Sequence, residues 1–296
     1  MFPSEQALRQ RLKPVSTFDN RITPKQEKLM TKISIEPPVD DIEGVKPEVA
    51  KAVEKMLRGG RRYFGSSGAS LTHQAYNPDW KGKSGLKPEL VKVGLEAERS
   101  TTKILQKWIE DKPNAVLIDS CHIRGWGKEE VVDEELGLID TGDTDHVLII
   151  GDEVILIDTK RWKSGTDQFP RAYTVGDDGK VLRSGKDFPG GGVHMRQAVH
   201  MWLEYLHEDA SLTGIVLINA EKTQVFRNRN WYTQIYRLVE LARFEELLNE
   251  KWNKYIDDYD KTHINTTLVS QVVVSAVKPY DEFSRIISEK GLRDFK

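Results

Sequence analysis

The chain has 296 residues, of which 38% are hydrophobic, and its formal net charge at pH 7 is -2. That length and apolar content suit one large domain or two smaller ones. No stretch approaches the roughly 18 apolar residues of a membrane span, and the N-terminus lacks the charged and apolar regions of a signal peptide. The single cysteine, Cys121, excludes an internal disulfide and a cysteine-based zinc cluster. We therefore expect a cytoplasmic protein with no membrane partner.

Residues 1–86 are predicted to form an N-terminal arm, a helix and a basic loop. Residues 1–44 are polar and indicate only one short helix, which begins near Thr23. A second helix is predicted from Val45 to Arg58. The stretch from Gly65 to Ser84 is predicted as a long loop, because it is rich in glycine, serine, asparagine and lysine.

The basic and aromatic sequence from Arg58 to Phe64 has two interpretations. Its cations could contact a nucleic-acid backbone, with Tyr63 or Phe64 available for base stacking. Alternatively, Gly59 and Gly60 end the preceding helix, where the helix dipole favours nearby cations. The sequence alone leaves both interpretations open.

A helix is predicted from residue 87 to residue 111, because its apolar residues recur with the 3.6-residue period and Pro113 follows. It contains two acids that face different ways. Glu96 shares a face with lysines such as Lys103, which is typical of a solvated stripe. Glu98 lies at the border of the apolar stripe, in line with Leu105. We therefore expect Glu98 to be the acid that points inward.

Residues 144–160 predict a buried β-hairpin. Two short apolar runs, Val147 to Ile150 and Val154 to Ile157, are joined by a Gly-Asp turn signal and are rich in β-branched residues. Charged residues occupy the open end of this hairpin: Asp145, Asp158 and Lys160. Because side chains alternate along a strand, Asp158 and Lys160 should project side by side.

Two carboxylates and a lysine in this position favour a metal-dependent phosphodiesterase. Burial penalises each charge unless it binds something, and hard cations such as Mg²⁺ take carboxylate, water and phosphate oxygens as ligands. A lysine can orient an attacking water or stabilise charge that develops on a phosphate. The acid-x-Lys pattern is uninformative alone, but only the match at Asp158 ends an apolar strand. The structural alternative is a simple ion pair at a strand end.

The remaining elements complete an alternating pattern of helices and strands. A second hairpin is predicted from Tyr173 to Leu182, a helix from His194 to His207 and a strand from Gly214 to Asn219. Helices are expected at residues 238–259 and 280–290, separated by a strand at 268–277. We expect His146 to pack or hydrogen-bond against the next layer, and Cys121 to be a small buried residue. The C-terminal part carries no readable motif and could either complete the fold or mediate self-association.

The charges are segregated along the chain. Residues 55–107 contain eleven Lys and Arg against four acids, whereas residues 111–158 contain thirteen acids against three bases. A basic rim beside an acidic centre that attracts cations suits phosphate binding better than the net charge suggests.

The order of these motifs resembles the nuclease-related domain called NERD, within the restriction-endonuclease-like nucleases of PD-(D/E)XK type. The resemblance rests on Glu98 in the helix, the Asp145-His146 pair before an apolar strand, the sequence Ile157-Asp-Thr-Lys-Arg-Trp162, and Gln197 on a later helix. It covers roughly residues 90 to 250. Two departures are Ala97, where the family usually has glycine, and Asp158, where it often has glutamate.

The resemblance implies a central mixed β-sheet flanked by helices, dependence on Mg²⁺ or Mn²⁺, and phosphodiester hydrolysis that leaves 5′-phosphate and 3′-hydroxyl ends. Carried over position by position, it implies a catalytic set with Gln197 as an auxiliary polar residue: Glu98, Asp145, Asp158, Lys160 and Gln197. The metal ligands would be Asp145, Asp158 and Glu98.

Together these observations predict an α/β protein with a restriction-endonuclease-like core at residues 87–250. The N-terminal arm precedes this core, and a helical extension at residues 251–296 follows it. The expected function is that of a metal-dependent nuclease whose partner is nucleic acid, DNA more than RNA. The alternatives are a nucleic-acid-binding module that has lost turnover, and a structural or assembly protein in which the acids only form ion pairs.

Overall fold

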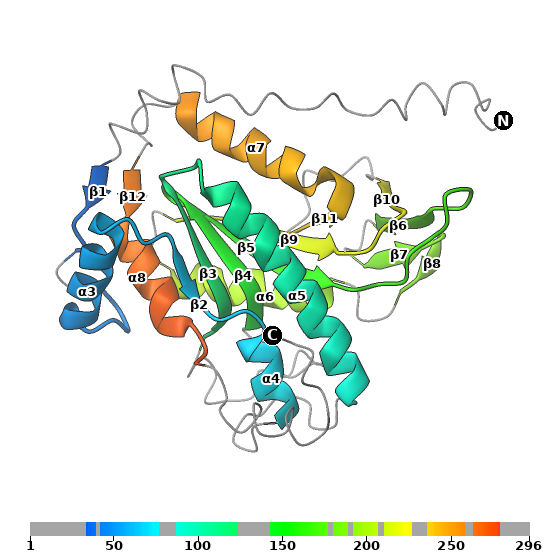
Figure 1. The fold of residues 1–296 in the computed structure, drawn as a ribbon, viewed down its shortest axis with the longest axis horizontal. Coiled ribbons are helices and arrows are strands. Elements are labelled where there is room, and N and C mark those ends of the chain that lie inside the picture. Colours follow the sequence, from blue (N-terminus) through cyan, green and yellow to red (C-terminus); the bar gives the residue numbers. More distant parts are fainter. Residues whose placement is uncertain are drawn as a thin grey trace. The chain divides into compact units, whose positions relative to one another are not determined.

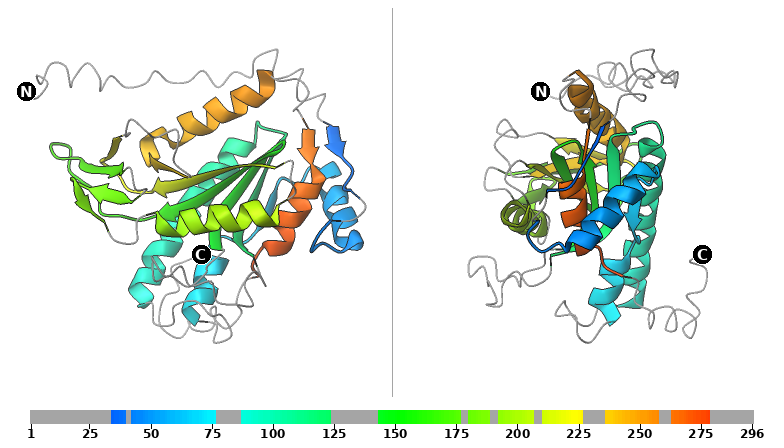
Figure 2. Two further views of the ribbon diagram at one scale, coloured as in Figure 1. Left: turned by 180° about the vertical axis from the view of Figure 1, so that it is seen from behind. Right: turned by 90° about the vertical axis from the view of Figure 1, so that its left-hand side faces the viewer.

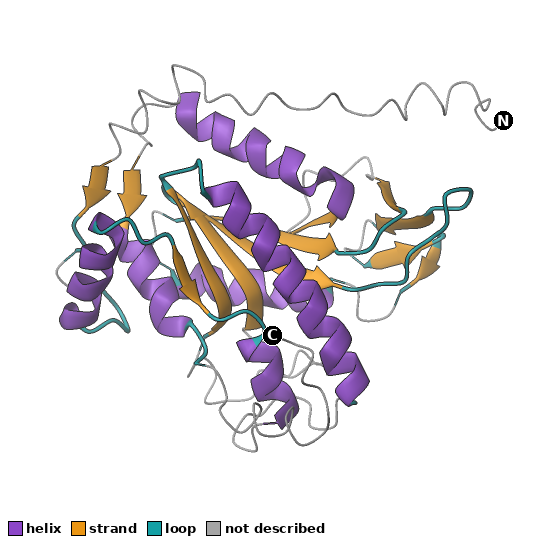
Figure 3. Ribbon diagram, viewed as in Figure 1, coloured by secondary structure: helices purple, strands orange, loops and turns teal. Residues whose placement is uncertain are grey.

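The computed structural model describes residues 34–39, 42–76, 87–123, 143–176, 180–188, 192–206, 210–226, 236–257 and 263–278, which belong to one compact unit. The fold is α/β, with mixed β-sheets flanked by helices (Figures 1 and 3). The described helices are α3 (Pro47–Arg58), α4 (Ala69–Tyr76), α5 (Pro88–Ile109), α6 (Val193–Tyr205), α7 (Leu241–Asp257) and α8 (Thr266–Ser275).

A six-stranded sheet forms the centre, in the order β11-β9-β5-β4-β3-β2. Its strands are β2 (Tyr63–Gly65), β3 (Ala115–His122), β4 (Asp143–Ile150), β5 (Glu153–Lys160), β9 (Ser211–Ile218) and β11 (Tyr236–Glu240). Strand β4 runs antiparallel to both of its neighbours, β3 and β5, whereas β5, β9 and β11 run parallel, as do β2 and β3. Parallel connections need crossovers, and α6 supplies the one between β5 and β9.

Helices cover both faces of this sheet. Helix α5 lies across one face, against β3 and β5, and α7 is joined to it by a hydrogen bond from Trp108 to Asn249 (Figure 1). Helices α6 and α8 lie on the opposite face, as the reverse view shows (Figure 2). The apolar side chains of β4 and β5 alternate between these two layers, since Val147 and Val154 join the cluster that includes α6 and α8. Burial on both faces explains the uninterrupted apolar runs of these strands, Val147 to Ile150 and Val154 to Ile157.

Two smaller sheets flank the centre. A four-stranded sheet has the order β10-β6-β7-β8, formed by β6 (Arg171–Val175), β7 (Val181–Arg183), β8 (Lys186–Asp187) and β10 (Thr223–Phe226). It follows the carboxyl ends of β5 and β9 in the chain, and it projects at that end of the central sheet (Figure 1). A two-stranded sheet pairs β1 (Ser34–Glu36) with β12 (His263–Asn265).

Most of the predicted elements are confirmed. The hairpin of residues 144–160 is β4 and β5, turned at Gly151 with φ of +58° and Asp152. The helix predicted at 87–111 is α5, and the hairpin predicted from Tyr173 pairs β6 with β7. The helix predicted from Val45 begins at Pro47 as α3, and the strand predicted at 214–219 is β9.

Two predictions are wrong, and one boundary moves. The valine-rich stretch at 268–277 is helix α8 rather than a strand, because the Asn265 side chain accepts a hydrogen bond from the Leu268 amide and caps a helix that is buried on several sides. The loop predicted from Gly65 to Ser84 contains helix α4. The helix predicted from residue 238 begins at Leu241, after strand β11. The helices expected near Thr23 and at 280–290 lie outside the described residues.

Among the described residues, no helix combines the length and the apolar character that crossing a membrane requires.

Candidate functional site

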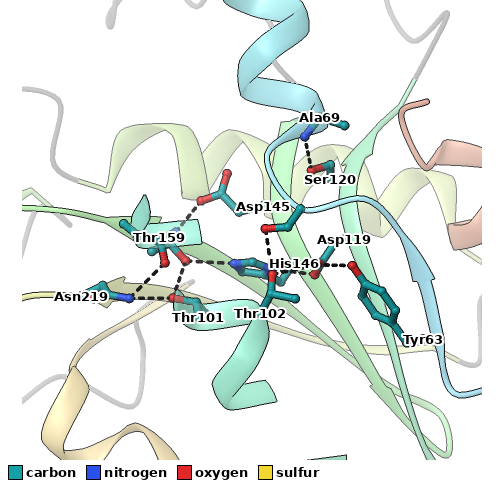
Figure 4. Close-up of polar contacts among 12 residues, drawn as sticks. Tyr63, Ala69, Thr101, Thr102, Asp119, Ser120, Asp145, His146, Thr159 and Asn219 are labelled. Carbon is teal, nitrogen blue, oxygen red and sulfur yellow. Dashed lines mark hydrogen bonds and ion pairs between the residues drawn. The ribbon is translucent and has the colours of Figure 1, made fainter. Parts of the chain in front are cut away.

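The candidate site lies where strands β4 and β5 separate. Their last ladder pair is His146 with Ile157. Beyond it β4 stays paired with β3, and β5 stays paired with β9 as far as Lys160. The side chain of Asp145 takes the place of a ladder partner, since its Oδ2 accepts the Thr159 amide at 2.6 Å (Figure 4). The sheet therefore opens at the residues that carry the predicted carboxylates.

Asp158 and Lys160 project to the same side of β5, as alternation predicted. Lys160 Nζ donates to Asp158 Oδ1 at 2.7 Å, and the two side chains are 29% and 13% exposed respectively. The second oxygen, Asp158 Oδ2, is buried and has no hydrogen-bond partner among the described residues. Half of this carboxylate is thus left for a further ligand.

Glu98 approaches the same point from helix α5. Its side chain is turned inward and the residue is only 4% exposed, whereas Glu96 is exposed, so the prediction of the inward face is confirmed. Glu98 Oε2 is buried and, within the described part of the chain, unpaired. A Cβ added at Gly68 would lie 3.7 Å from this oxygen, so the segment that follows β2 covers the carboxylate.

These four groups interact electrostatically. Burial and then the neighbouring Asp145 raise the pKa of Glu98 well above its usual range. Burial and then Asp158 raise the pKa of Asp145 to about 7. Burial alone would lower the pKa of Lys160, but Asp158, Asp145 and Glu98 outweigh it and raise that pKa. Three acids around one ammonium leave a surplus of negative charge that a further cation would neutralise.

A buried polar network supports the site from the α5 side of the sheet (Figure 4). The His146 ring lies between two groups, with Nδ1 2.7 Å from Asp119 Oδ1 and Nε2 3.1 Å from Thr159 Oγ1. The other oxygen of Asp119 accepts the hydroxyls of Tyr63 at 3.0 Å and Thr102 at 2.7 Å. His146 does hydrogen-bond as expected, but its partners belong to β3 and β5 of the same sheet, and the network reaches helix α5 only through Asp119 and Thr159.

The network also ties strand β5 to helix α5 next to Glu98. Thr159 Oγ1 donates to Thr101 Oγ1 at 3.3 Å. Asn219 Nδ2 donates to Thr101 Oγ1 at 3.0 Å and to the carbonyl of Ala97 at 3.1 Å. Sequence analysis missed Asp119, Thr101 and Asn219. Their signal was present as polar residues inside or directly after otherwise apolar segments.

Gln197 is not joined to the carboxylates by any described contact. It lies on α6, and its Oε1 is buried without a hydrogen-bond partner among the described residues. Helix α6 does reach this end of the sheet, since Trp202 Nε1 donates to Thr144 Oγ1 at 3.1 Å.

The side chains between Arg58 and Phe64 are engaged in contacts within the protein. Arg62 donates to the carbonyls of Leu57 and Pro113, Phe64 is buried, and Tyr63 binds Asp119. The interpretation in which Gly59 and Gly60 end helix α3 therefore fits the contacts, and the buried Phe64 ring is not available for base stacking. Cys121 is buried, as expected.

Among the described residues, no group of three or more histidine, cysteine, aspartate or glutamate side chains is placed so that it could hold a metal ion. A magnesium site does not require one, because Mg²⁺ commonly binds through one or two carboxylates, with water and substrate phosphate as the other ligands.

No protein-family model matches the sequence, and a search of curated proteins finds no match either.

Proposed function

We propose that the protein is a metal-dependent nuclease whose core is restriction-endonuclease-like and resembles the NERD domain. The observation that carries this proposal is the convergence of Glu98, Asp145, Asp158 and Lys160 at the point where β4 and β5 separate. These are the residues that the resemblance assigns to catalysis. They come from three different elements that the fold brings together.

The side chains present fit a hard divalent cation such as Mg²⁺ or Mn²⁺. Glu98 Oε2 and Asp158 Oδ2 are buried oxygens that lack a partner among the described residues. Unsatisfied buried oxygens are costly, and a cation would satisfy them. Asp145 and Asp158 would be the principal ligands, with Glu98 binding directly or through water. When bound, the metal would polarise the scissile phosphate and lower the pKa of a water molecule.

The chain's own residues would position the substrate and stabilise charge. Lys160, now paired with Asp158, would orient the attacking water or stabilise the negative charge that develops on the phosphate. Thr159 would keep Asp145 in place through its backbone amide. The surrounding layers would exclude bulk water, which strengthens these electrostatic interactions.

A purely structural ion pair explains less of the geometry. Lys160 and Asp158 do form an ion pair, but that pair gives no role to Glu98, which is buried beside two further acids and has an oxygen without a partner in the described part of the chain. Burying surplus negative charge costs stability unless it serves to bind a ligand.

The decisive experiment is cleavage of labelled single- and double-stranded DNA and RNA in the presence of Mg²⁺, Mn²⁺ or EDTA. Cleavage should require metal, and Asp145→Ala or Asp158→Ala should abolish it while the fold is retained. Asp167→Ala is a matched control, because Asp167 is an exposed aspartate whose ion pair is with the exposed Lys222. Retention of more than a few per cent of activity by both site variants would contradict the proposed centre.

A further inference from the structure

The cationic side chains of the four-stranded sheet all lie on one of its two faces. Tyr173 pairs with Arg183, and Arg183 pairs with Lys186, so all three side chains lie on the same face. Arg171 precedes Tyr173 by two residues in β6 and therefore shares this face. The acid of these four strands, Asp187, follows Lys186 and points to the opposite face. We call Arg171, Arg183 and Lys186 the cationic face.

These cations have no carboxylate partners within the described part of the chain. The guanidinium of Arg183 stacks over the ring of Phe188, 4.9 Å from its centroid. The nearby loop acid, Asp167, is already paired with Lys222 at 3.2 Å. Positive charge on this face is thus available to an external anion.

Tyr173 adds a buried donor between the two arginines. The residue is 1% exposed, and its hydroxyl has no hydrogen-bond partner among the described residues. Burial raises the pKa of Tyr173, and both Arg171 and Arg183 oppose that rise, so their charges act at this hydroxyl. Because the Tyr173 hydroxyl is buried, the donors of this face that an external phosphate can reach are the two guanidinium groups and the Lys186 ammonium.

The sheet that carries the cationic face is connected to strand β5 by a short segment of chain. Trp162 comes two residues after Lys160, a span of at most about 7 Å. Its ring lies 4.9 Å from Tyr173 and 4.8 Å from Phe188. Figure 1 shows the four-stranded sheet beyond the carboxyl ends of β5 and β9, the end at which Asp158 and Lys160 lie.

We propose that the cationic face binds backbone phosphates of the nucleic-acid strand beside the phosphate that is cleaved. This inference rests on the proposed nuclease function and gives it a substrate-binding surface. The surface reads charge along the backbone and is independent of base sequence, because its donors are cations.

The test measures binding of fluorescent single-stranded and duplex DNA by anisotropy, at several salt concentrations. The protein carries Asp158→Asn so that binding is read without turnover. Arg171→Gln with Arg183→Gln should weaken binding. The double substitution should also reduce the slope of log affinity against log salt by about 1.4 for single strands or about 1.8 for duplex, because two phosphate contacts are lost. Arg171→Lys with Arg183→Lys should retain most of that slope.

The matched control is Lys103→Gln with Lys107→Gln, two exposed cations of α5 that lower the total charge equally. An equal loss of slope in this control and in the arginine variant would overturn the proposed surface, as would failure of the Asp158→Asn protein to bind either DNA. If the arginine variant does not fold, Lys186→Gln is the substitute, and an unchanged slope there would overturn the surface too.

Cleavage assays on the protein with Asp158 intact distinguish the cationic-face proposal from the nuclease proposal. Metal-dependent cleavage with no slope change in the arginine variant would overturn the cationic face and leave the nuclease function standing. A slope change without cleavage under any metal would support the cationic face as a nucleic-acid-binding surface and contradict the nuclease function.

Discussion

At the scale of single residues, the candidate site holds more negative charge than a folded protein ordinarily retains. Asp145 illustrates the cost, because burial and Asp158 raise its pKa to about 7 from the ordinary value of 3.8. The folded state therefore keeps a proton that the unfolded chain releases above about pH 4. Stability linked to this group must fall as pH rises from about 4 to about 7.

Asp145→Asn should therefore stabilise the metal-free protein at pH 8 and have little effect at pH 4. The shift corresponds to at most about 4 kcal/mol, so a gain of roughly 1 to 3 kcal/mol is expected at pH 8. Urea unfolding of both proteins in EDTA, at pH 4 and at pH 8, measures this gain in the free energy of unfolding. A variant less stable than the original chain at pH 8 would show that the Asp145 carboxylate is not strained by its neighbours.

Lys160 should matter for turnover more than for metal binding. Lys160→Met keeps much of the side-chain volume but removes the ammonium that contacts Asp158. Loss of one preorganised charge donor typically costs about 2.7 to 4 kcal/mol of barrier, so kcat should fall by about 10² to 10³. Single-turnover cleavage together with metal titration checks this, and a variant with near-normal kcat would remove Lys160 from the mechanism.

Glu98 and Glu96 provide a matched pair on one helix. Glu98→Gln should weaken cleavage supported by Mg²⁺ sharply, because Glu98 is buried beside Asp145. Glu96→Gln should behave nearly like the original protein, because Glu96 is exposed and a surface charge contributes only about 0 to 1 kcal/mol. Side-by-side Mg²⁺ titrations of cleavage rank the two, and the reverse ranking would contradict the assignment.

At the scale of elements, helical and strand periodicity were sufficient to predict the principal carboxylates. The inward face of α5 and the alternation of β5 follow from apolar spacing, and these placed Glu98 and the Asp158–Lys160 pair. Periodicity could not find Asp119, because its partners Tyr63, Thr102 and His146 come from three separate segments. It also failed for α8, where β-branched valines favour a strand locally but the cap and tertiary packing produce a helix.

His146 links β3 to β5, and its contribution to stability should be coupled to that of Asp119. Burial alone would lower the pKa of His146, but Asp119 outweighs it and raises that pKa, so this pair contributes stability that is complete below about pH 6.5 and is lost as pH rises further. In a double-mutant cycle, His146→Gln and Asp119→Asn should show a coupling energy of about 1 to 3 kcal/mol at pH 6. Additive effects of the two substitutions in urea unfolding would mean that the network transmits nothing between the strands.

At the scale of the whole molecule, the two proposals require opposite charges to lie close together. The acids of the candidate centre come from α5, β4 and β5, whereas the cationic face belongs to the sheet that follows β5 and β9 in the chain. A divalent cation held by the acids would join these two regions into one surface for phosphates. The acidic centre should therefore be a source of instability without metal and a source of stability with it.

Metal binding should then be visible as thermal stabilisation, independently of any cleavage. A ligand at about 100 times its dissociation constant stabilises the folded state by about 2.7 kcal/mol, which corresponds to a rise in Tm of about 4 to 5 °C for a chain of this size. The rise with Mg²⁺ or Mn²⁺ should be larger at pH 8 than at pH 5.5, because the carboxylates must lose their protons to bind. Asp158→Asn should remove it, and Asp167→Asn should leave it unchanged. An equal rise in both variants would place the metal elsewhere on the protein.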